Sequence, residues 1–372
     1  MIYLDNAATT RVYPELNETI NYYNTERFFN GSALYAEAAA VSRDLKNARE
    51  NLLRHLGGDG GLIFTASGTE ADNMAFFCKT FKPKSRIIIS DIEHAAVLNT
   101  AAAFKQKGFD VVSCHVDGGG RAVFERFQEL LTPETAFVSI VHVSNETGAV
   151  NDIEKIARAA KAANKDCIVH SDGVQAFKKI GVNVGKLGAD LYSVSAHKIH
   201  APKGVGALYF KKGMNLNTFI YGGGQEMNIR SATENLAGIA AFSKAADIAD
   251  GRGIDRGLLP RLKDFLTDNF DVMINTPEED ISGILSVSFA WIRSETLLHS
   301  LEKHGVIVGT GSACSSKKGV GRIAEALRLP KKYYEGILRI SISGDTTEDE
   351  IEFFKEKLLE EHAKLFKRQK GN

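Results

Sequence analysis

Short runs of apolar residues alternate with stretches of helical periodicity along the first two thirds of the chain. A continuous apolar run of strand length is typical of a strand buried on both faces, and a helix between two such runs connects parallel strands. The pattern therefore predicts an α/β fold with a mostly parallel central sheet. The predicted strands cover 61–67, 86–90, 110–116, 135–143, 167–172, 190–196 and 206–210. The predicted helices between them cover 69–80, 93–108, 122–131 and 151–164.

The pattern changes after the first 250 residues. The segment 249–257 is rich in Gly, Arg and Asp, which predicts a domain boundary. Residues 284–290 alternate between apolar and polar, which predicts a half-exposed strand. We therefore expect a large domain over residues 13–250 and a smaller α+β domain made of residues 1–12 and 251–372. The other elements predicted in the small domain are a helix over 294–305, strands over 306–312 and 336–343, and an amphipathic helix over 347–370.

Composition excludes several classes of protein. Hydrophobic residues make up 44% and charged residues 25% of the chain, as in an ordinary globular protein. The 46 basic side chains balance the 46 acidic ones, which argues against binding to nucleic acid or membranes through a basic surface. No apolar run approaches the ~18 residues that span a bilayer, and the first residues lack the basic region of a signal peptide. The four cysteines include no CxxC pair. We therefore expect a cytoplasmic protein without a metal centre.

The segment 193–204, SVSAHKIHAPKG, follows a predicted strand and carries the first candidate for chemistry. A lysine at the mouth of a sheet can bind the aldehyde of pyridoxal phosphate, and Lys198 holds such a position. This cofactor also needs a carboxylate for its pyridine nitrogen. Asp172 ends the preceding predicted strand, where ligands of open α/β sheets bind, and Gln175 lies three residues further on.

The phosphate of such a cofactor needs hydrogen-bond donors, and residues 66–73 provide them between a strand and a helix. Gly68 and Thr69 offer backbone N–H groups and a hydroxyl at a helix N-terminus, which attracts anions. His94 begins the next helix and could stack on the ring. Each feature also has an ordinary structural interpretation, such as a helix cap or a turn. Their common position at one edge of one sheet favours the functional interpretation.

Eight motifs in sequence order resemble the landmarks of the NifS/IscS-like cysteine desulfurases, fold-type I pyridoxal-phosphate enzymes within the class-V aminotransferase family. The resemblance extends from residue 3 to about residue 350, and its most specific parts are SAHK and GSACSS. It implies the fold-type I transferase architecture and the conversion of L-cysteine to L-alanine. The motifs are LDNAATT (4–10), FTASGTEADN (64–73), EHAAVL (93–98), HVSNETG (142–148), HSDGVQ (170–175), SAHKIHAPKGVGALY (195–209), RSATEN (230–235) and GSACSS (311–316).

The resemblance assigns a role to each candidate residue. Lys198 is implied to bind the cofactor aldehyde and His94 to stack on the ring, and both are implied to take part in catalysis. Arg339 is implied to clamp the substrate carboxylate, with Asn145 nearby. Thr233 matches the position that reaches the phosphate of the partner subunit, which implies an obligate homodimer. The remaining cofactor ligands implied are Asp172 at the pyridine nitrogen, Gln175 and Asn145 at the ring hydroxyl, and Gly68, Thr69, Ser195 and His197 at the phosphate.

Cys314 decides which reaction the resemblance implies. It lies in a run of small and polar residues, 309–322, which predicts a loop that can move in the small domain. A thiolate there could take the substrate sulfur as a persulfide and pass it to an acceptor. Most free cysteines are buried and inert, and we expect this of the other three. They are Cys78, Cys114 and Cys167.

Several alternatives stay open at this stage. A selenocysteine lyase would use the same cofactor pocket. An aminotransferase needs no thiol, so Cys314 argues against it, and the presence of Lys198 and Asp172 argues against an inactive interaction protein. The sulfur acceptor could be an iron–sulfur scaffold, a tRNA-thiolation protein or a thiamine-pathway carrier. The segment 29–35, FNGSALY, lacks the proline of the family's GNPSS-like segment, which leaves that substrate-side loop undefined.

Overall fold

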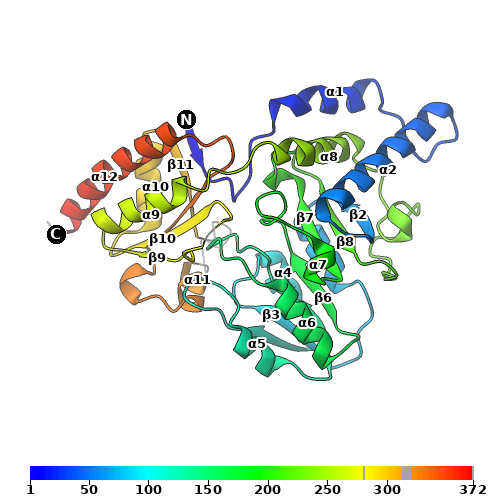
Figure 1. Cartoon of the computed structure of the whole chain (residues 1–372), viewed down its shortest axis with the longest axis horizontal. Coiled ribbons are helices and arrows are strands. Elements are labelled where there is room, and N and C mark those ends of the chain that lie inside the picture. Colours follow the sequence, from blue (N-terminus) through cyan, green and yellow to red (C-terminus); the bar gives the residue numbers. More distant parts are fainter. Residues whose placement is uncertain (280, 312–319, 371–372) are drawn as a thin grey trace.

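A computed structural model describes residues 1–279, 281–311 and 320–370 of the chain, so that Cys314 lies outside the described residues. The larger of two sheets has seven strands in the order β2-β8-β7-β6-β5-β3-β4 (Figure 1). Four neighbouring pairs are parallel, and only β8 runs antiparallel, to both β7 and β2, among the described strands. The mostly parallel sheet expected from the sequence is confirmed. Its strands are β2 (Gly61–Thr65), β3 (Arg86–Ser90), β4 (Asp110–Cys114), β5 (Thr135–Ser139), β6 (Ile168–Asp172), β7 (Leu191–Ser195) and β8 (Gly206–Phe210).

Helices cover both faces of this sheet. In β3, Ile87 packs in the cluster formed with α3 and α4, whereas Ile88 packs in the cluster formed with α5 and α6. Successive strand residues point to opposite faces, so burial on both faces explains the continuous apolar runs in the sequence. The helices are α1 (Asn17–Thr25), α2 (Ala36–Leu56), α3 (Gly68–Phe76), α4 (Ala95–Gln106), α5 (Phe124–Leu130), α6 (Ile153–Ala163), α7 (Val184–Leu187) and α8 (Leu236–Asp250).

A second sheet of five described strands, in the order β1-β11-β12-β10-β9, forms the small domain together with the helices that pack against it. The N-terminal strand β1 pairs in parallel with β11, so the first residues of the chain join a sheet built from its last third (Figure 1). None of the described helices is long and apolar enough to cross a membrane. The strands are β1 (Ile2–Leu4), β9 (Val272–Ile274), β10 (Ile284–Phe289), β11 (Val306–Thr310) and β12 (Ile337–Ser341). The helices are α9 (Leu258–Asn269), α10 (Ser294–Glu302), α11 (Val320–Ala326) and α12 (Glu348–Lys370).

The expectation of a half-exposed strand over 284–290 is wrong, because every residue of β10 is buried. Its apolar residues, such as Leu285 and Val287, join the core packed against α9, α10 and α12. The intervening serines, Ser286 and Ser288, accept hydrogen bonds from Asn275 Nδ2 at 3.1 and 2.8 Å. A buried hydroxyl with a partner is compatible with a dry interior. The alternation therefore separates an apolar from a polar buried face.

Residues 5–10, which we call the N-terminal strap, connect the two sheets. At the small sheet, Ala7 N donates to Ser341 Oγ at 2.8 Å. At the large sheet, Thr10 N donates to the carbonyl of His197 at 3.0 Å, and Thr10 Oγ1 accepts from His200 N at 2.7 Å. The strap therefore lies against the loop that follows β7, which is the loop that carries Lys198.

Candidate functional site

Lys198 lies directly after β7, in a short 3-10 helix at the carboxyl edge of the large sheet. Its Nζ donates to two carbonyls of the N-terminal strap, those of Ala7 at 2.6 Å and Ala8 at 2.7 Å. The lysine predicted from the sequence is therefore held at the sheet edge by a segment from the N-terminal end of the chain. Carbonyl oxygens accept hydrogen bonds but carry no full charge. They therefore orient the amine without forming an ion pair with it.

Asp172 ends β6 beside Lys198 and is only 4% exposed. Burial raises the pKa of Asp172, while the charges of His94 and Lys198 counteract the rise. Asp172, His94 and Asp72 each place a polar atom within 4.8 Å of the others. His94 is exposed at the N-terminus of α4, and its Nδ1 accepts from Ala96 N at 3.2 Å. That bond leaves Nε2 as the protonated nitrogen of a neutral His94 ring.

The turn between β2 and α3 lies where the sequence predicts the phosphate site. Gly68 is buried as the first residue of α3, where backbone N–H groups have no partner inside the helix. Ser195 is 2% exposed, and its Oγ is a buried hydroxyl without a partner among the described residues. At Gly206 of β8, a Cβ would lie 2.5 Å from the backbone carbon of Ser67, so only glycine allows this close approach.

The two other residues predicted at the phosphate differ in exposure. Thr69 is exposed beside Gly68, and its side chain is accessible from solvent. His197 is half-buried, and its Nδ1 lies 3.1 Å from Thr9 Oγ1. Burial, followed by the charges of Lys198, Lys203 and Lys179, lowers the pKa of His197 to about 4. A neutral His197 ring can still donate one hydrogen bond to an anion.

Gln175 extends from the turn after β6 toward the N-terminal strap. It is 4% exposed, and its Nε2 donates to the carbonyl of Ala7 at 2.8 Å. Ala7 O therefore accepts from both Gln175 and Lys198. On its other side, Gln175 Oε1 accepts from Lys179 Nζ at 2.5 Å.

Arg339 lies on β12 and faces the same site from the small domain. It is 6% exposed, and its Nη2 forms an ion pair with Asp5 Oδ1 at 2.9 Å. Its Nη1 donates to the carbonyl of Asn145 at 2.9 Å. Arg339 Nε is buried without a partner among the described residues. Two neighbours thus fix the guanidinium, and its remaining N–H groups, including that of Nε, have no hydrogen-bond partner among the described residues.

Thr233 does not join this cluster. It is exposed and lines a separate cavity together with the segment from Phe28 to Gly31. Cys314 lies outside the described residues. Burial raises the pKa of each of the other three thiols to about 12, so all three stay protonated at neutral pH, as expected for packed cysteines. They are Cys78, Cys114 and Cys167.

The sequence analysis missed three residues close to this site. Asp5 pairs with Arg339 and belongs to the LDNAATT motif, which was noted without a role for its acid. Lys179 contacts Gln175 four residues earlier, a spacing that could have indicated the pair. Glu93 precedes His94 and is fully buried, and its Oε1 accepts from Ser90 Oγ at 2.5 Å and from Val141 N at 2.8 Å.

Comparison with known proteins gives consistent matches over most of the chain. The family model described as aminotransferase class-V matches residues 2–354. Cysteine desulfurase IscS of Dictyoglomus turgidum is 35% identical over 367 residues, which cover 95% of this chain and 92% of that protein. A solved structure described as a NifS-like protein has a TM-score of 0.89 at 33% identity and covers 96% of this chain and 98% of its own. A structure described as SspA in complex with cysteine has a TM-score of 0.81 at 27% identity, with 93% and 100% covered.

Proposed function

The chain belongs to the class-V aminotransferase family, and we propose that it is a pyridoxal-phosphate-dependent cysteine desulfurase that leaves the sulfur of L-cysteine on Cys314. The observation that carries this proposal is the meeting of three groups at one sheet edge. Lys198 and the buried Asp172 come from the large sheet, and Arg339 comes from the small one. An amine, a carboxylate and a carboxylate-binding guanidinium are what an amino-acid substrate and this cofactor need.

The residues at the edge of the large sheet fit pyridoxal phosphate. The unpartnered hydroxyl of Ser195 and the N–H groups at the start of α3 offer donors for a phosphate, and Gly206 lets the backbone of Ser67 approach β8 closely. In our proposal, Gly68, Thr69, Ser195 and His197 hold the phosphate, Asp172 the pyridine nitrogen and Lys198 the aldehyde. His94 covers the ring, and Gln175 and Asn145 lie at its hydroxyl. When bound, this cofactor acts as an electron sink for the α-carbon of an amino acid.

The chain's own side chains supply the remaining steps. Arg339 binds the substrate carboxylate through its planar fork, in a geometry set by Asp5 and Asn145. The amine of Lys198 takes and returns the proton of the α-carbon. The thiolate of Cys314 takes the substrate sulfur, so that L-cysteine and one thiol become L-alanine and one persulfide. Cys314 is proposed because the three described cysteines are buried with protonated thiols.

The test compares Cys314→Ser with Cys78→Ala, which removes a buried thiol instead. Cys314→Ser should bind L-cysteine but release no L-alanine, and no persulfide should form. Cys78→Ala should keep the wild-type turnover of cysteine and its persulfide. Alanine release and mass spectrometry of the cysteine peptides measure both. Wild-type turnover of cysteine by Cys314→Ser, or a persulfide on another cysteine, would overturn the assignment. Selenocysteine as a parallel substrate separates a selenocysteine lyase, whose activity would survive the change.

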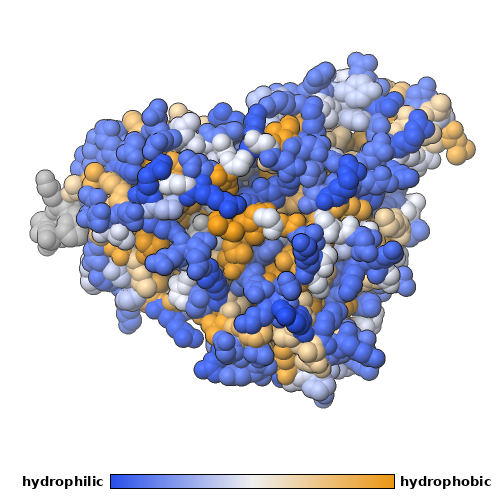
Figure 2. Space-filling view, in the orientation of Figure 1, coloured by the Kyte–Doolittle hydropathy of each residue, from blue (hydrophilic) through white to orange (hydrophobic). Residues whose placement is uncertain are grey.

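A homodimer with composite sites is part of the proposal. The segment between α1 and α2 exposes three large apolar side chains, Phe28 at 63%, Leu34 at 104% and Tyr35 at 49%. Figure 2 shows hydrophobic surface at the end of the molecule where these two helices meet. The same segment lines the cavity that contains Thr233. Apolar surface of this kind supports coverage by a second copy, which would bring Thr233 to the partner's phosphate.

Thr233→Ala tests the composite site. Loss of one hydrogen bond to a charged phosphate costs about 1.5–3 kcal/mol, so cofactor retention should weaken while the dimer persists. Light scattering gives the mass, and dialysis against buffer measures the loss of cofactor. A fully active monomer in dilute solution would contradict the dimer.

The cellular role extends the proposal further. We propose a sulfur-acceptor protein as partner, either an iron–sulfur scaffold or a tRNA-thiolation protein, because a persulfide is a carrier form of sulfur. A role in iron–sulfur cluster assembly and a cytoplasmic location follow, since a reactive thiol has to stay reduced. We also propose the domain division into 13–250 and 1–12 plus 251–372. It is supported by the pairing of β1 with β11 in the small sheet.

A further inference from the structure

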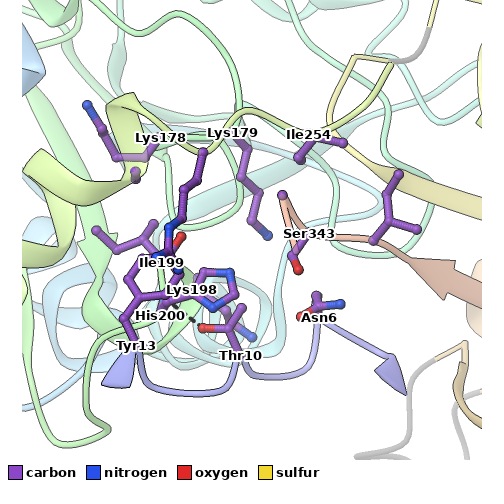
Figure 3. A pocket seen from close by; sticks show the side chains of 14 residues that line it. Asn6, Thr10, Tyr13, Lys178, Lys179, Lys198, Ile199, His200, Ile254 and Ser343 are labelled. Carbon is purple, nitrogen blue, oxygen red and sulfur yellow. Dashed lines mark hydrogen bonds between the residues drawn. The ribbon is translucent and has the colours of Figure 1, made fainter. Parts of the chain in front are cut away.

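Lys179 occupies an unusual position behind the site. It lines a small cavity, partly open to solvent, whose lining also includes Lys198, residues of the N-terminal strap and Ser343 of the small domain. Figure 3 shows its side chain pointing into this cavity. Two neighbouring cations are paired with carboxylates, Lys178 with Asp250 and Arg252 with Glu15. Lys179 has no carboxylate within ion-pair distance among the described residues.

The polar partner of Lys179 is an amide. Its Nζ donates to Gln175 Oε1 at 2.5 Å, and the other end of the amide donates from Nε2 to Ala7 O at 2.8 Å. An ammonium can only donate and a carbonyl can only accept. The oxygen of the Gln175 amide therefore faces Lys179, and its nitrogen faces Ala7 O. Without the ammonium, Ala7 O would be the one described partner that still holds the amide in this orientation, and the Oε1 end would lose its donor.

The environment makes a charged amine costly at this position. Burial, followed by the charges of Lys198 and Arg339, lowers the pKa of Lys179 to about 7. A lysine that is partly desolvated among other cations contributes little to stability. Titratable side chains with strongly shifted pKa values are concentrated at functional sites, where a specific geometry outweighs the cost of burying a charge.

We propose that Lys179 is a positioning residue that fixes the amide of Gln175 with its Nε2 toward Ala7 O, the carbonyl that also holds Lys198. The inference rests on the proposed function, because Gln175 is assigned to the cofactor ring. One N–H of Nε2 is used by Ala7, and the second has no acceptor among the described residues. Lys179 thereby keeps a donor, and not an oxygen, on the side of the amide that faces the strap.

The experiment is a double-mutant cycle on cofactor binding. Apoprotein of the wild type, Lys179→Met, Gln175→Ala and the double variant is titrated with pyridoxal 5'-phosphate, and visible absorption gives the Kd. Lys178→Met is the matched control, since it removes the adjacent lysine. We expect Lys179→Met to raise the Kd roughly tenfold, as for the loss of one charge-assisted hydrogen bond. Lys178→Met should change it less than about twofold. The double variant should be no weaker than the weaker single variant.

The absorption maximum of the bound cofactor is the second readout. Lys179→Met and Gln175→Ala should shift it in the same direction, and the double variant should shift it no further. A merely structural lysine would leave this maximum in place. A Kd for Lys179→Met within twofold of the wild type, or effects of the two substitutions that multiply, would overturn the proposal. If wild-type apoprotein fails to bind pyridoxal phosphate, the proposed function itself is wrong.

Discussion

The two sides of the site are built in different ways. On the large-sheet side, Asp172, Ser195 and Lys198 follow neighbouring parallel strands, and backbone and hydroxyl groups surround them. On the small-domain side, Arg339 depends on Asp5, which is 334 positions away in the sequence. Asp172 and Ser195 are placed by the strands of one sheet, whereas the ion pair of Arg339 forms only when the N-terminal strap is docked.

The strap couples the two sides. Ala7 accepts from Lys198 on the large-sheet side, and its own N–H donates to Ser341 in the small sheet. The strap therefore orients the amine of Lys198 and, through Asp5, the guanidinium of Arg339. In our proposal, the groups that bind the cofactor belong to the large-sheet side, whereas Arg339, which binds the substrate carboxylate, belongs to the small-domain side.

The largest effect is expected on the large-sheet side, from Lys198→Ala. Without the amine, neither cofactor attachment nor proton transfer at the α-carbon is possible, so alanine release should fall by at least about 10³-fold. Lys203→Ala removes an exposed lysine from the same loop and should leave turnover unchanged. Borohydride treatment and peptide mapping should find the cofactor on the Lys198 peptide of the wild type. An adduct on a different lysine would refute the assignment.

A smaller effect is expected on the small-domain side, from Arg339→Ala. The loss of a charge-assisted contact of about 1.5–3 kcal/mol should raise the KM for L-cysteine by roughly 10–100-fold. The cofactor's absorption should stay as in the wild type, because the large-sheet side is intact. Arg339→Lys keeps the charge but loses the fork, and should recover only part of the affinity. If Arg339→Ala lowered kcat and left the KM for L-cysteine unchanged, the proposed role of Arg339 in substrate binding would be wrong.

The large-sheet side could be predicted from the sequence because its causes are local. Strands buried on both faces appear as apolar runs, and Asp172 and Lys198 follow those runs directly. The helices α2 and α8 escaped the analysis, although Leu52 of one and Phe242 of the other share a core. Periodicity indicates a helix, but it does not reveal a packing partner that lies almost 200 positions away.

The small-domain side was predictable only in part. Arg339 was assigned by resemblance, whereas its partner Asp5 depends on a tertiary contact that no local pattern encodes. The burial of β10 was missed because alternation looks alike whether the polar face meets water or a buried amide such as Asn275. Thr233 and Cys314 remain predictions, one because its proposed contact needs a second copy and the other because it lies outside the described residues.

The smallest effect is expected on stability. The test compares two carboxyl groups, one on the large-sheet side and one in the small domain, whose pKa values shift in opposite directions. Glu93, on the large-sheet side, bonds a hydroxyl and a backbone N–H, and burial raises its pKa from 4.5 to about 8. Glu361, in the small domain, pairs with Lys364 and His304, and these contacts lower its pKa.

Glu93→Gln should therefore become more stable than the wild type as the pH rises. Between about pH 4.5 and 8, the unfolded chain releases the proton of Glu93 while the folded protein keeps it, so the wild type loses stability with increasing pH. Above about pH 8 both states have released the proton, and the difference stays constant. The melting temperature of Glu93→Gln should exceed that of the wild type by about 3–6 °C at pH 8 and converge with it near pH 5.

For Glu361→Gln the sign is opposite, because the paired carboxylate stabilises the wild type above its ordinary pKa and this advantage disappears as the pH falls. Parallel melting curves for wild type and Glu93→Gln from pH 5 to 8 would show that Glu93 is ionised in the folded protein.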